Sequence, residues 1–298
     1  MRELAKNLGR RSVRAAMGPS AVRAPLRAAS KRGLLPFAVW SRLPVEADFE
    51  VNYPHGIRFR YLPTAYDGIG RQLYWAGEHF WEYETIEVFC RLAHRARRVL
   101  DIGANTGTYS LIACAAHPDT RVTAFEPVPR IRAQFVEAVA LNGFGSRCEI
   151  RCDAVSCECG TACFHVPSEA LPTSSSLHPE GFRGLAGDHI EVPLTTIDAL
   201  LAEDDAVDLI KIDVEGFEHS VLQGMERTLR QHRPAVFLEC NHDGPVDALE
   251  TIINAHGLQL YHLRPGGPVR IDGFGRDASD HHRNFLALHP EREGWLLG

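Results

Sequence analysis

The sequence predicts an α/β fold in which a mostly parallel sheet is covered by helices on both faces. From Val99 to the end of the chain, short apolar runs with strand character alternate with segments of helical spacing. This alternation is typical of βαβ units. A glycine-containing turn joins the first apolar run to its helix. The length of 298 residues suits one large domain with an N-terminal extension, or two small domains.

The beginning of the chain differs from the rest in charge. Residues 1–33 contain the single acid Glu3, although the whole chain has a formal net charge of -6. Their basic residues are Arg2, Lys6, Arg10, Arg11, Arg14, Arg23, Arg27, Lys31 and Arg32. Such a segment is compatible with a transit peptide, a membrane-surface or partner contact, or a packing extension. The acidic body argues against a general affinity for nucleic acid.

Charge and pattern together suggest three parts. We assign residues 1–47 to a basic N-terminal extension, residues 48–96 to a hairpin and helix cap region, and residues 97–298 to the main domain. The chain has no apolar core of signal-peptide length and no apolar run of about 18 residues. We therefore expect a soluble, cytoplasmic protein without a transmembrane segment, and homo-oligomerisation stays open.

The cap region contains a predicted hairpin and a predicted helix. Phe49–Tyr53 and Ile57–Tyr61 alternate in polarity around a short Pro-His-Gly turn, and Glu82–Ala96 has helical spacing. Aromatic residues are dense between Tyr53 and Phe89. They suit a lid over a small-molecule pocket, or an ordinary apolar layer that joins the hairpin to the body.

The stretch Val99–Ser110 predicts a strand, a tight turn and the start of a helix. Gly103 and Gly107 permit positive φ, and they let a ligand lie against the main chain. The spacing Asp-x-Gly-x-x-x-Gly, which begins at Asp101, differs from the Gly-x-Gly-x-x-Gly of dinucleotide sites. An acid at the strand end would repel a pyrophosphate but would pair with an ammonium group. The pattern therefore favours S-adenosylmethionine (SAM) over NAD.

Two further acids lie at predicted strand ends. The second strand, Arg121–Pro127, carries Glu126 at a position where a carboxylate can accept hydrogen bonds from ribose hydroxyls. The third strand, Cys148–Val155, ends near Asp153, which is placed to meet an adenine amine. A plain capping acid is the alternative interpretation of Glu126.

The fourth predicted strand, Val207–Gly216, is apolar except for three charges near its end. Lys211, Asp213 and Glu215 alternate, so they project to one side if the strand continues. Open α/β sheets bind ligands at this carboxyl edge. Charges in an apolar strand are costly unless they are paired or functional, and a Lys211–Asp213 salt bridge is the structural alternative.

The remaining elements complete seven predicted strands. Helices are expected at 130–141 and 218–232, with another that begins at Thr196 or Asp198, and strands at 235–240, 258–261 and 284–288. Residues 167–189 read as a long loop that could contact the substrate. The cysteines between 148 and 163 lack the spacing of a zinc site, so we expect buried strand cysteines.

The motifs together resemble the FkbM family of SAM-dependent methyltransferases over roughly residues 80–290. They are Asp101-Ile102-Gly103-Ala104-Asn105-Thr106-Gly107, Phe125-Glu126-Pro127, Thr195-Thr196-Ile197-Asp198 and Lys211-Ile212-Asp213-Val214-Glu215-Gly216-Phe217-Glu218. The resemblance implies a Rossmann-like, seven-stranded, mostly parallel sheet of class I methyltransferase type with a reversed final hairpin. It also implies O-methylation of a hydroxyl on a sugar, polyketide or other natural product. Phe217 stands where the family commonly has alanine.

The resemblance further implies which residues bind the cofactor. The expected set is Glu84, Asp101, Gly103, Ala104, Asn105, Gly107, Glu126, Pro127, Asp153 and Ala154. The first motif would surround the methionine end of SAM, Glu126 the ribose, and Asp153 with Ala154 the adenine. Glu84 enters through a resemblance of Tyr83-Glu84 to a Tyr-Glu pair that often precedes the first core strand of the family, and Glu82 is the alternative match.

An alcohol acceptor needs a group that removes its proton. Asp213, Glu215 and His242 are the candidates for a general base, in that order. A Mg²⁺ ion held by Asp213 and Glu239 is an alternative to a metal-free site. An NAD(P)-dependent oxidoreductase and a non-catalytic SAM-binding or scaffold protein are the competing functions. The partner that we expect is a hydroxylated small molecule, with no specific nucleic acid.

Overall fold

The computed structural model describes residues 20–45, 47–63, 67–79, 82–167, 187–241, 244–275 and 282–296. The chain packs as two compact units. The first comprises residues 1–51 and 60–83, and the second comprises residues 52–59 and 84–298. The boundaries at 47/48 and 96/97 that were expected from the sequence stay predictions.

The first unit is built from short helices and most of an antiparallel hairpin. Its elements are α2 (Ser20–Lys31), α3 (Phe37–Trp40), β1 (Phe49–Asn52), β2 (Arg58–Tyr61) and α4 (Gly68–Trp75), with the tip of the hairpin in the second unit. The ring of Phe49 contacts those of Tyr61 and Tyr74, with centroids 5.6 and 5.1 Å apart. Asp67 caps α4 through the amide of Gly70. The aromatic residues therefore form an apolar layer inside this unit.

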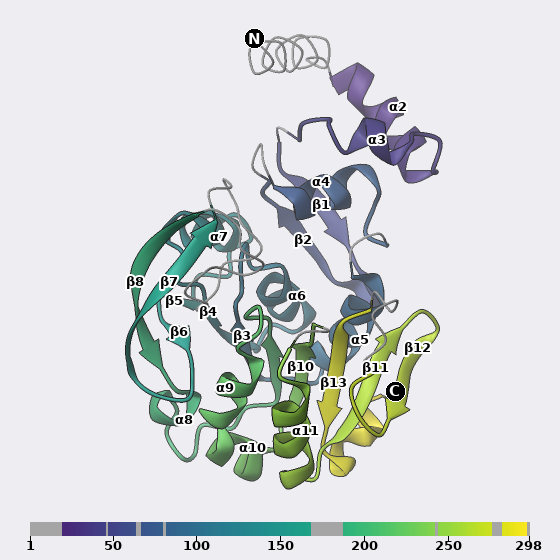
Figure 1. Ribbon diagram of the computed structural model, residues 1–298. Helices are drawn as coiled ribbons and strands as arrows, with labels where there is room; N and C mark the ends of the chain where they lie inside the picture. Colours follow the sequence, from purple (N-terminus) through teal and green to yellow (C-terminus); the bar gives the residue numbers. More distant parts are fainter. Residues whose placement is uncertain are drawn as a thin grey trace. The chain divides into compact units, whose positions relative to one another are not determined.

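The second unit contains an eight-stranded mixed sheet (Figure 1). Its order is β12-β11-β13-β10-β9-β3-β4-β5. The strands are β3 (Arg98–Ile102), β4 (Arg121–Phe125), β5 (Cys148–Arg151), β9 (Leu209–Ile212), β10 (Ala235–Glu239), β11 (Gln259–Arg264), β12 (Gly267–Ile271) and β13 (Asn284–Leu288). Strands β5, β4, β3, β9 and β10 run parallel, whereas β13 is antiparallel to both β10 and β11. The predicted Rossmann-like α/β class is confirmed, with β12 as an additional edge strand.

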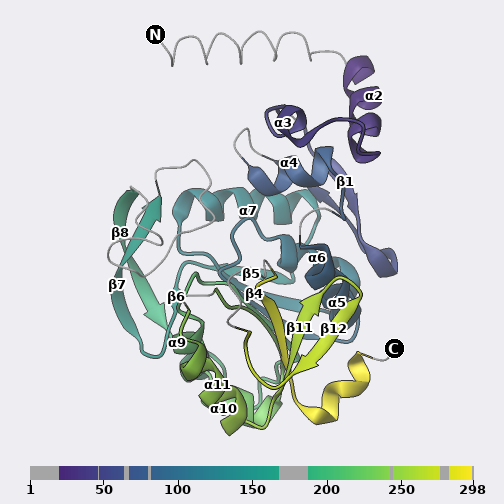
Figure 2. The same cartoon turned by 45° about the vertical axis from the view of Figure 1, so that its right-hand side comes forward.

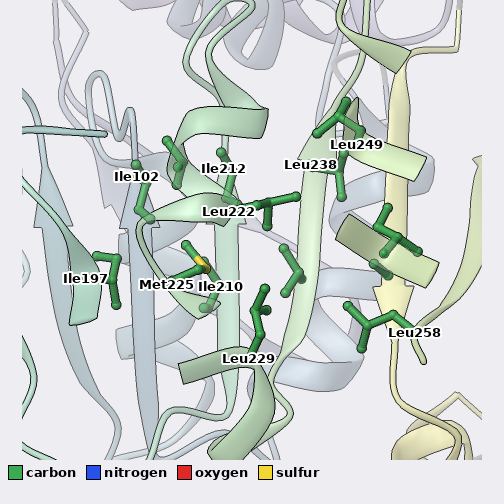
Figure 3. Packing of buried hydrophobic residues seen from close by; sticks show 14 of the residues in the cluster. Ile102, Ile197, Ile210, Ile212, Leu222, Met225, Leu229, Leu238, Leu249 and Leu258 are labelled. Atoms are coloured by element: carbon green, nitrogen blue, oxygen red, sulfur yellow. The ribbon is translucent and has the colours of Figure 1, made fainter. Parts of the chain in front are cut away.

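Helices cover both faces of this sheet. They are α5 (Tyr83–Ala93), α6 (Thr108–Ala116), α7 (Pro129–Leu141), α8 (Ile197–Leu200), α9 (Glu218–Gln223), α10 (Glu226–His232) and α11 (Val246–Ala255), followed by the 3-10 helix η3 (Pro290–Trp295). On one face, Ile210 and Ile212 of β9 pack with Leu222 of α9 (Figure 3). On the other face, the ring of Phe237 in β10 lies 5.2 Å from that of Phe89 in α5. Alternate residues of the central strands therefore enter two different apolar layers, which explains their continuous apolar character.

The part of the sequence between β5 and β9 forms a separate three-stranded sheet. It consists of β6 (Ala154–Val155), β7 (Gly160–Pro167) and β8 (Gly187–Thr195), in the order β6-β8-β7 (Figure 2). The single predicted strand 148–155 is therefore wrong, because the chain leaves the large sheet after Arg151 and joins the small one at Ala154. Most of the predicted loop, residues 168–186, lies outside the described residues.

The predicted helix 218–232 is interrupted at Gly224. A Cβ atom at this position would lie 2.1 Å from the carbonyl oxygen of Ser156, so the main chains approach too closely for a side chain. Helix α10 begins after this break. The carboxylate of Asp198 caps it by accepting hydrogen bonds from the amides of Arg227 and Thr228, at 2.7 and 3.0 Å. Thr196 caps α8 through the amide of Ala199. The Thr-Thr-Ile-Asp motif is therefore a pair of helix caps.

The cysteine prediction is largely wrong. Cys148 in β5 is buried, but Cys152, Cys157, Cys159 and Cys163 are exposed, and all eight cysteines of the chain are free. The exposed ones lie where the chain crosses to the small sheet and along its outer strand, and no apolar layer covers them. No helix in the described part of the chain is long and apolar enough to cross a membrane.

Candidate functional site

A cleft opens at the carboxyl ends of β3, β4 and β9. The lining residues come from the glycine turn, the ends of β4 and β9, helix α7, and strands β6 and β7. They are Ile102, Gly103, Asn105, Phe125, Glu126, Pro127, Ile131, Asp153, Ala154, Val155, Phe164, Asp213, Val214 and Glu215. The cleft lies within the second unit.

The glycine turn is shaped by close packing against neighbouring segments. Gly103 has a φ of 79°, and a Cβ atom there would lie 1.8 Å from the carbonyl oxygen of Asp213. Gly107 has a φ of 84°, and its Cβ would lie 2.0 Å from the ring of Phe135 in α7. Both positions therefore need glycine for conformation and for space. Gly103 brings the turn directly against the segment that follows β9.

Asp101 fastens this turn to helix α6. The carboxylate is 2% exposed, and one oxygen accepts hydrogen bonds from the amide and hydroxyl of Ser110, at 3.0 and 2.6 Å. Burial raises the pKa of Asp101 to about 6, against the lowering effect of the Ser110 hydrogen bond and the Lys211 charge. Asp101 is not among the residues that line the cleft.

Glu126 connects the end of β4 to the glycine turn from inside the cleft. One carboxylate oxygen accepts from the amide of Val128 at 2.8 Å, and the other accepts from the amide of Asn105 at 3.0 Å. Burial raises the pKa of Glu126 to about 7. Each oxygen keeps a second lone pair, so the carboxylate can still accept hydrogen bonds from a ligand.

Strand β9 ends at Ile212, earlier than expected. Of the three charged residues predicted for this strand, Lys211 lies within it, whereas Asp213 and Glu215 lie in the loop that follows. Lys211 is 1% exposed and lies over the ring of Tyr109 in α6, with its Nζ atom 5.3 Å from the ring centroid. The same Nζ lies 3.3 Å from a carboxylate oxygen of Asp213, which lines the cleft. The ion pair considered from the sequence is therefore present, and it joins a buried cation to a cleft carboxylate.

The loop after β9 is held by Glu218. Its Oε1 atom accepts from the amides of Val214 and Gly216, at 3.4 and 3.1 Å. Burial raises the pKa of Glu218 to about 7. Glu215 adopts a φ of 53°, which is unfavourable for a residue with a side chain. This loop therefore carries local strain where it lines the cleft.

Comparison with known proteins identifies the family. A family model described as the methyltransferase FkbM domain matches residues 101–262, which is more than half of the chain. The chain belongs to the FkbM methyltransferase family. The 31-O-demethyl-FK506 methyltransferase FkbM of Streptomyces tacrolimicus is 30% identical over 193 residues, which cover 54% of this chain and 72% of that protein.

Other relatives of this FkbM methyltransferase differ in length. The AMB antimetabolite synthetase AmbE of Pseudomonas aeruginosa is 27% identical over 201 residues, and the match spans 9% of that protein and 54% of this chain. The crystal structure of a methyltransferase FkbM from Methylobacillus flagellatus is 18% identical with a TM-score of 0.44. That comparison covers 74% of this chain and 52% of that one.

Membership of the FkbM methyltransferase family implies SAM as methyl donor, and the chemistry of the cleft fits this molecule. The charged residues that line the cleft are Glu126, Asp153, Asp213 and Glu215. In the described part of the chain no basic side chain lines the cleft. Acidic walls favour a sulfonium cation and disfavour the pyrophosphate of NAD(P). Apolar side chains such as Phe125, Phe164 and Val155 offer surfaces for an aromatic base.

The predicted cofactor residues of this FkbM methyltransferase divide into two groups. Those that line the cleft are Gly103, Asn105, Glu126, Pro127, Asp153 and Ala154, together with the predicted bases Asp213 and Glu215. Glu84, Asp101, Ala104 and Gly107 do not line it. His242 lies outside the described residues. In the described residues no cluster of three or more His, Cys, Asp or Glu side chains could hold a metal ion, and this includes the surroundings of Asp213 and Glu239.

The apolar half of the cleft was not predicted. Ile102 and Phe125 are the last residues of β3 and β4, so their position next to a ligand edge could have been inferred from strand ends. Phe164 comes from β7 of the small sheet. Its segment, Gly160–Pro167, is exposed over its first half and buried over its second, so no regular alternation marks it as a strand next to the cleft.

Proposed function

We propose that this FkbM methyltransferase transfers a methyl group from SAM to a hydroxyl oxygen of a small natural product, such as a sugar or polyketide. The relative from Streptomyces tacrolimicus, whose name describes methylation at an oxygen, supports this acceptor class. The observation that carries the proposal is a carboxylate, Asp213, that lines the cleft and is paired with the buried cation Lys211.

The cleft residues would hold SAM as follows. Glu126 would accept hydrogen bonds from the ribose hydroxyls, and Asp153 with Ala154 would contact the adenine. Gly103 and Asn105 would lie at the methionine end. Asp153 is itself held by Arg151, whose Nε atom lies 3.0 Å from its carboxylate. Asp101 and Gly107 would act from outside the cleft by fixing the glycine turn, through Ser110 and against Phe135. Ala104 and Glu84 stay predictions from the sequence.

Bound SAM supplies an activated methyl group on a sulfonium. The protein then has to position the acceptor oxygen and take its proton, and Asp213 is the proposed general base. The ammonium of Lys211 lies 3.3 Å from the Asp213 carboxylate and orients it towards the cleft. Glu215 is the second candidate because it lines the same cleft. His242 stays a prediction from the sequence.

A methyl-transfer assay with isotope-labelled SAM and a panel of hydroxylated metabolites tests the proposal. In Asp213→Asn we expect turnover to fall by about 10²- to 10⁴-fold, the usual contribution of a general base. SAM affinity should change little. Asp119→Asn is the control, because that side chain is 78% exposed and does not line the cleft. Full activity of Asp213→Asn would remove Asp213 from the mechanism.

The competing functions give different results in a thermal-shift comparison. A ligand that binds only the folded state raises the apparent stability by RT ln(1 + [L]/Kd). The proposed enzyme is stabilised by SAM and S-adenosylhomocysteine, whereas an oxidoreductase would be stabilised by NAD or NADP. A scaffold protein would bind SAM but would methylate no member of the panel.

A further inference from the structure

Three large apolar side chains of the first unit are exposed within the short stretch of sequence from residue 34 to residue 39. Leu34, Phe37 and Val39 are 73%, 63% and 45% exposed, and we call them the apolar tip. The other exposed large apolar side chains in the described part of the chain are Val136 and Val269, which lie far apart in the sequence. Single exposed apolar residues are ordinary, but a cluster marks a surface that contacts something else.

The apolar tip is held in place by regular structure on both sides. Helix α2 ends in a Schellman motif, in which the amides of Gly33 and Leu34 donate to the carbonyls of Ser30 and Ala29, at 2.9 and 3.0 Å. Gly33 has the positive φ of 72° that this motif requires. The chain then enters α3, which is anchored by the buried ring of Trp40. The apolar tip therefore lies in regular structure, between the end of α2 and the anchored helix α3.

Two exposed cations flank the apolar tip. Arg32 precedes it and Arg42 follows it, and both side chains are exposed. The guanidinium of Arg42 also donates a hydrogen bond to the main-chain carbonyl of Ala38, which holds this cation beside the tip. The nearby basic residues are already used inside the unit, since Arg27 lies 4.3 Å over the ring of Tyr74 and Lys31 pairs with Glu78 at 3.0 Å.

The wider sequence around the tip has one sign of charge. From Leu4 to Val45 the chain contains no Asp or Glu. An occupant of this surface therefore has to be anionic, and it has to offer an apolar environment to the tip.

We propose that the apolar tip docks on an anionic lipid bilayer. Lipid headgroups supply the negative charge for Arg32 and Arg42, and the acyl boundary below them accepts Leu34, Phe37 and Val39. A nucleic acid would satisfy the two arginines but would leave the aliphatic side chains in water. This surface is independent of the cleft and of the proposed methyl transfer.

Vesicle co-sedimentation of the full chain tests this proposal. We expect binding to vesicles of phosphatidylcholine mixed with phosphatidylglycerol, little binding to phosphatidylcholine alone, and weaker binding as salt rises. The variant Leu34→Ser, Phe37→Ser, Val39→Ser should lose at least about tenfold in partition coefficient, and so should Arg32→Gln with Arg42→Gln. Arg32→Lys with Arg42→Lys should keep most of the binding.

The control replaces exposed apolar residues elsewhere. Val136→Ser with Val269→Ser removes side chains that are 51% and 52% exposed and should bind vesicles like the original chain. Melting temperatures establish that each variant folds, and SAM titration reports on the cleft separately. Equal vesicle binding by all variants, or none by the original chain, overturns the proposal. So does a dimer in light scattering that the apolar-tip variant alone dissociates, because the occupant would then be a second copy.

Discussion

Replacing Gly103 by alanine perturbs the contact between the glycine turn and the loop after β9. Gly103 has a φ of 79°, and the new methyl carbon would lie 1.8 Å from the carbonyl oxygen of Asp213. This oxygen belongs to the main chain, so it cannot swing away like the end of a side chain. The amide of Asp213 donates to the carbonyl of Ile102 at 2.9 Å, and a shift of the loop strains this bond.

The magnitude follows from three contributions. The left-handed conformation costs an alanine roughly 1–2 kcal/mol. Overpacking typically adds about 1–3 kcal/mol, and a weakened hydrogen bond adds about 1 kcal/mol. We therefore expect Gly103→Ala to lose about 3–6 kcal/mol of unfolding free energy. Gly143→Ala is the matched control, since Gly143 has a φ of 70° but nothing within 4 Å of its Cβ. It should lose only the conformational part, about 1–2 kcal/mol.

Urea unfolding measures both variants, and calorimetric titration with SAM measures the cleft. Gly103→Ala should also lose SAM affinity, because Gly103 itself lines the cleft at the proposed methionine end, whereas Gly143→Ala should bind normally. Equal stability losses in the two variants, together with equal SAM affinities, would refute the reasoning.

Three further variants test the packing around the site. Glu218→Gln removes the titrating carboxyl group but keeps an oxygen that can accept the same hydrogen bonds. Burial raises the folded-state pKa of Glu218 to about 7 from 4.5. The protonated carboxyl group therefore contributes its full stabilisation of the native state below pH 4.5, and this stabilisation is lost as the pH rises through 7. The variant should therefore gain up to about 3 kcal/mol relative to the original chain over that interval in urea unfolding, and a pH-independent difference would contradict this. Asp198→Ala removes the cap of α10 and should cost about 1–2 kcal/mol in the same assay, more than Asp198→Asn. Gly107→Ala pushes a methyl to 2.0 Å from the ring of Phe135 and should unfold at lower urea than Gly143→Ala; a matching midpoint would show that the ring moves freely.

The fold class was predictable because local patterns and topology agree in the central strands. The runs that begin at Val99, Arg121 and Ala235 are apolar on both faces, and each is followed by helical spacing, so a covered parallel sheet is the consistent solution. The predicted hairpin corresponds to β1 and β2, and the predicted helix 130–141 corresponds to α7, which stops at Asn142 as the Asn-Gly pair indicated.

The small sheet escaped prediction because its strands have no continuous apolar run. Strand β7 is exposed over its first half and buried over its second, and β8 alternates weakly. The break after Arg151 depends on pairing of Ala154 with Leu194, a contact between distant parts of the chain. No local pattern marks such a crossing between sheets.

The candidate site was predictable where a residue's role follows from a strand end. Glu126, Asp153 and Asp213 follow strands and line the cleft. Asp101 has the same sequence signal but lies within β3 and faces α6, where Ser110 binds it. One residue of register separates a cleft-lining position from a buried one, and that register is set by packing of the whole sheet.

Isothermal titration of the full chain with SAM tests most directly whether the acidic cleft holds the methyl donor. We predict one site that binds SAM and S-adenosylhomocysteine, with affinity reduced in Glu126→Ala and unchanged in Asp119→Asn. Heat from NAD or NADP with none from SAM would contradict the assignment of the cleft. So would SAM binding that is indifferent to Glu126.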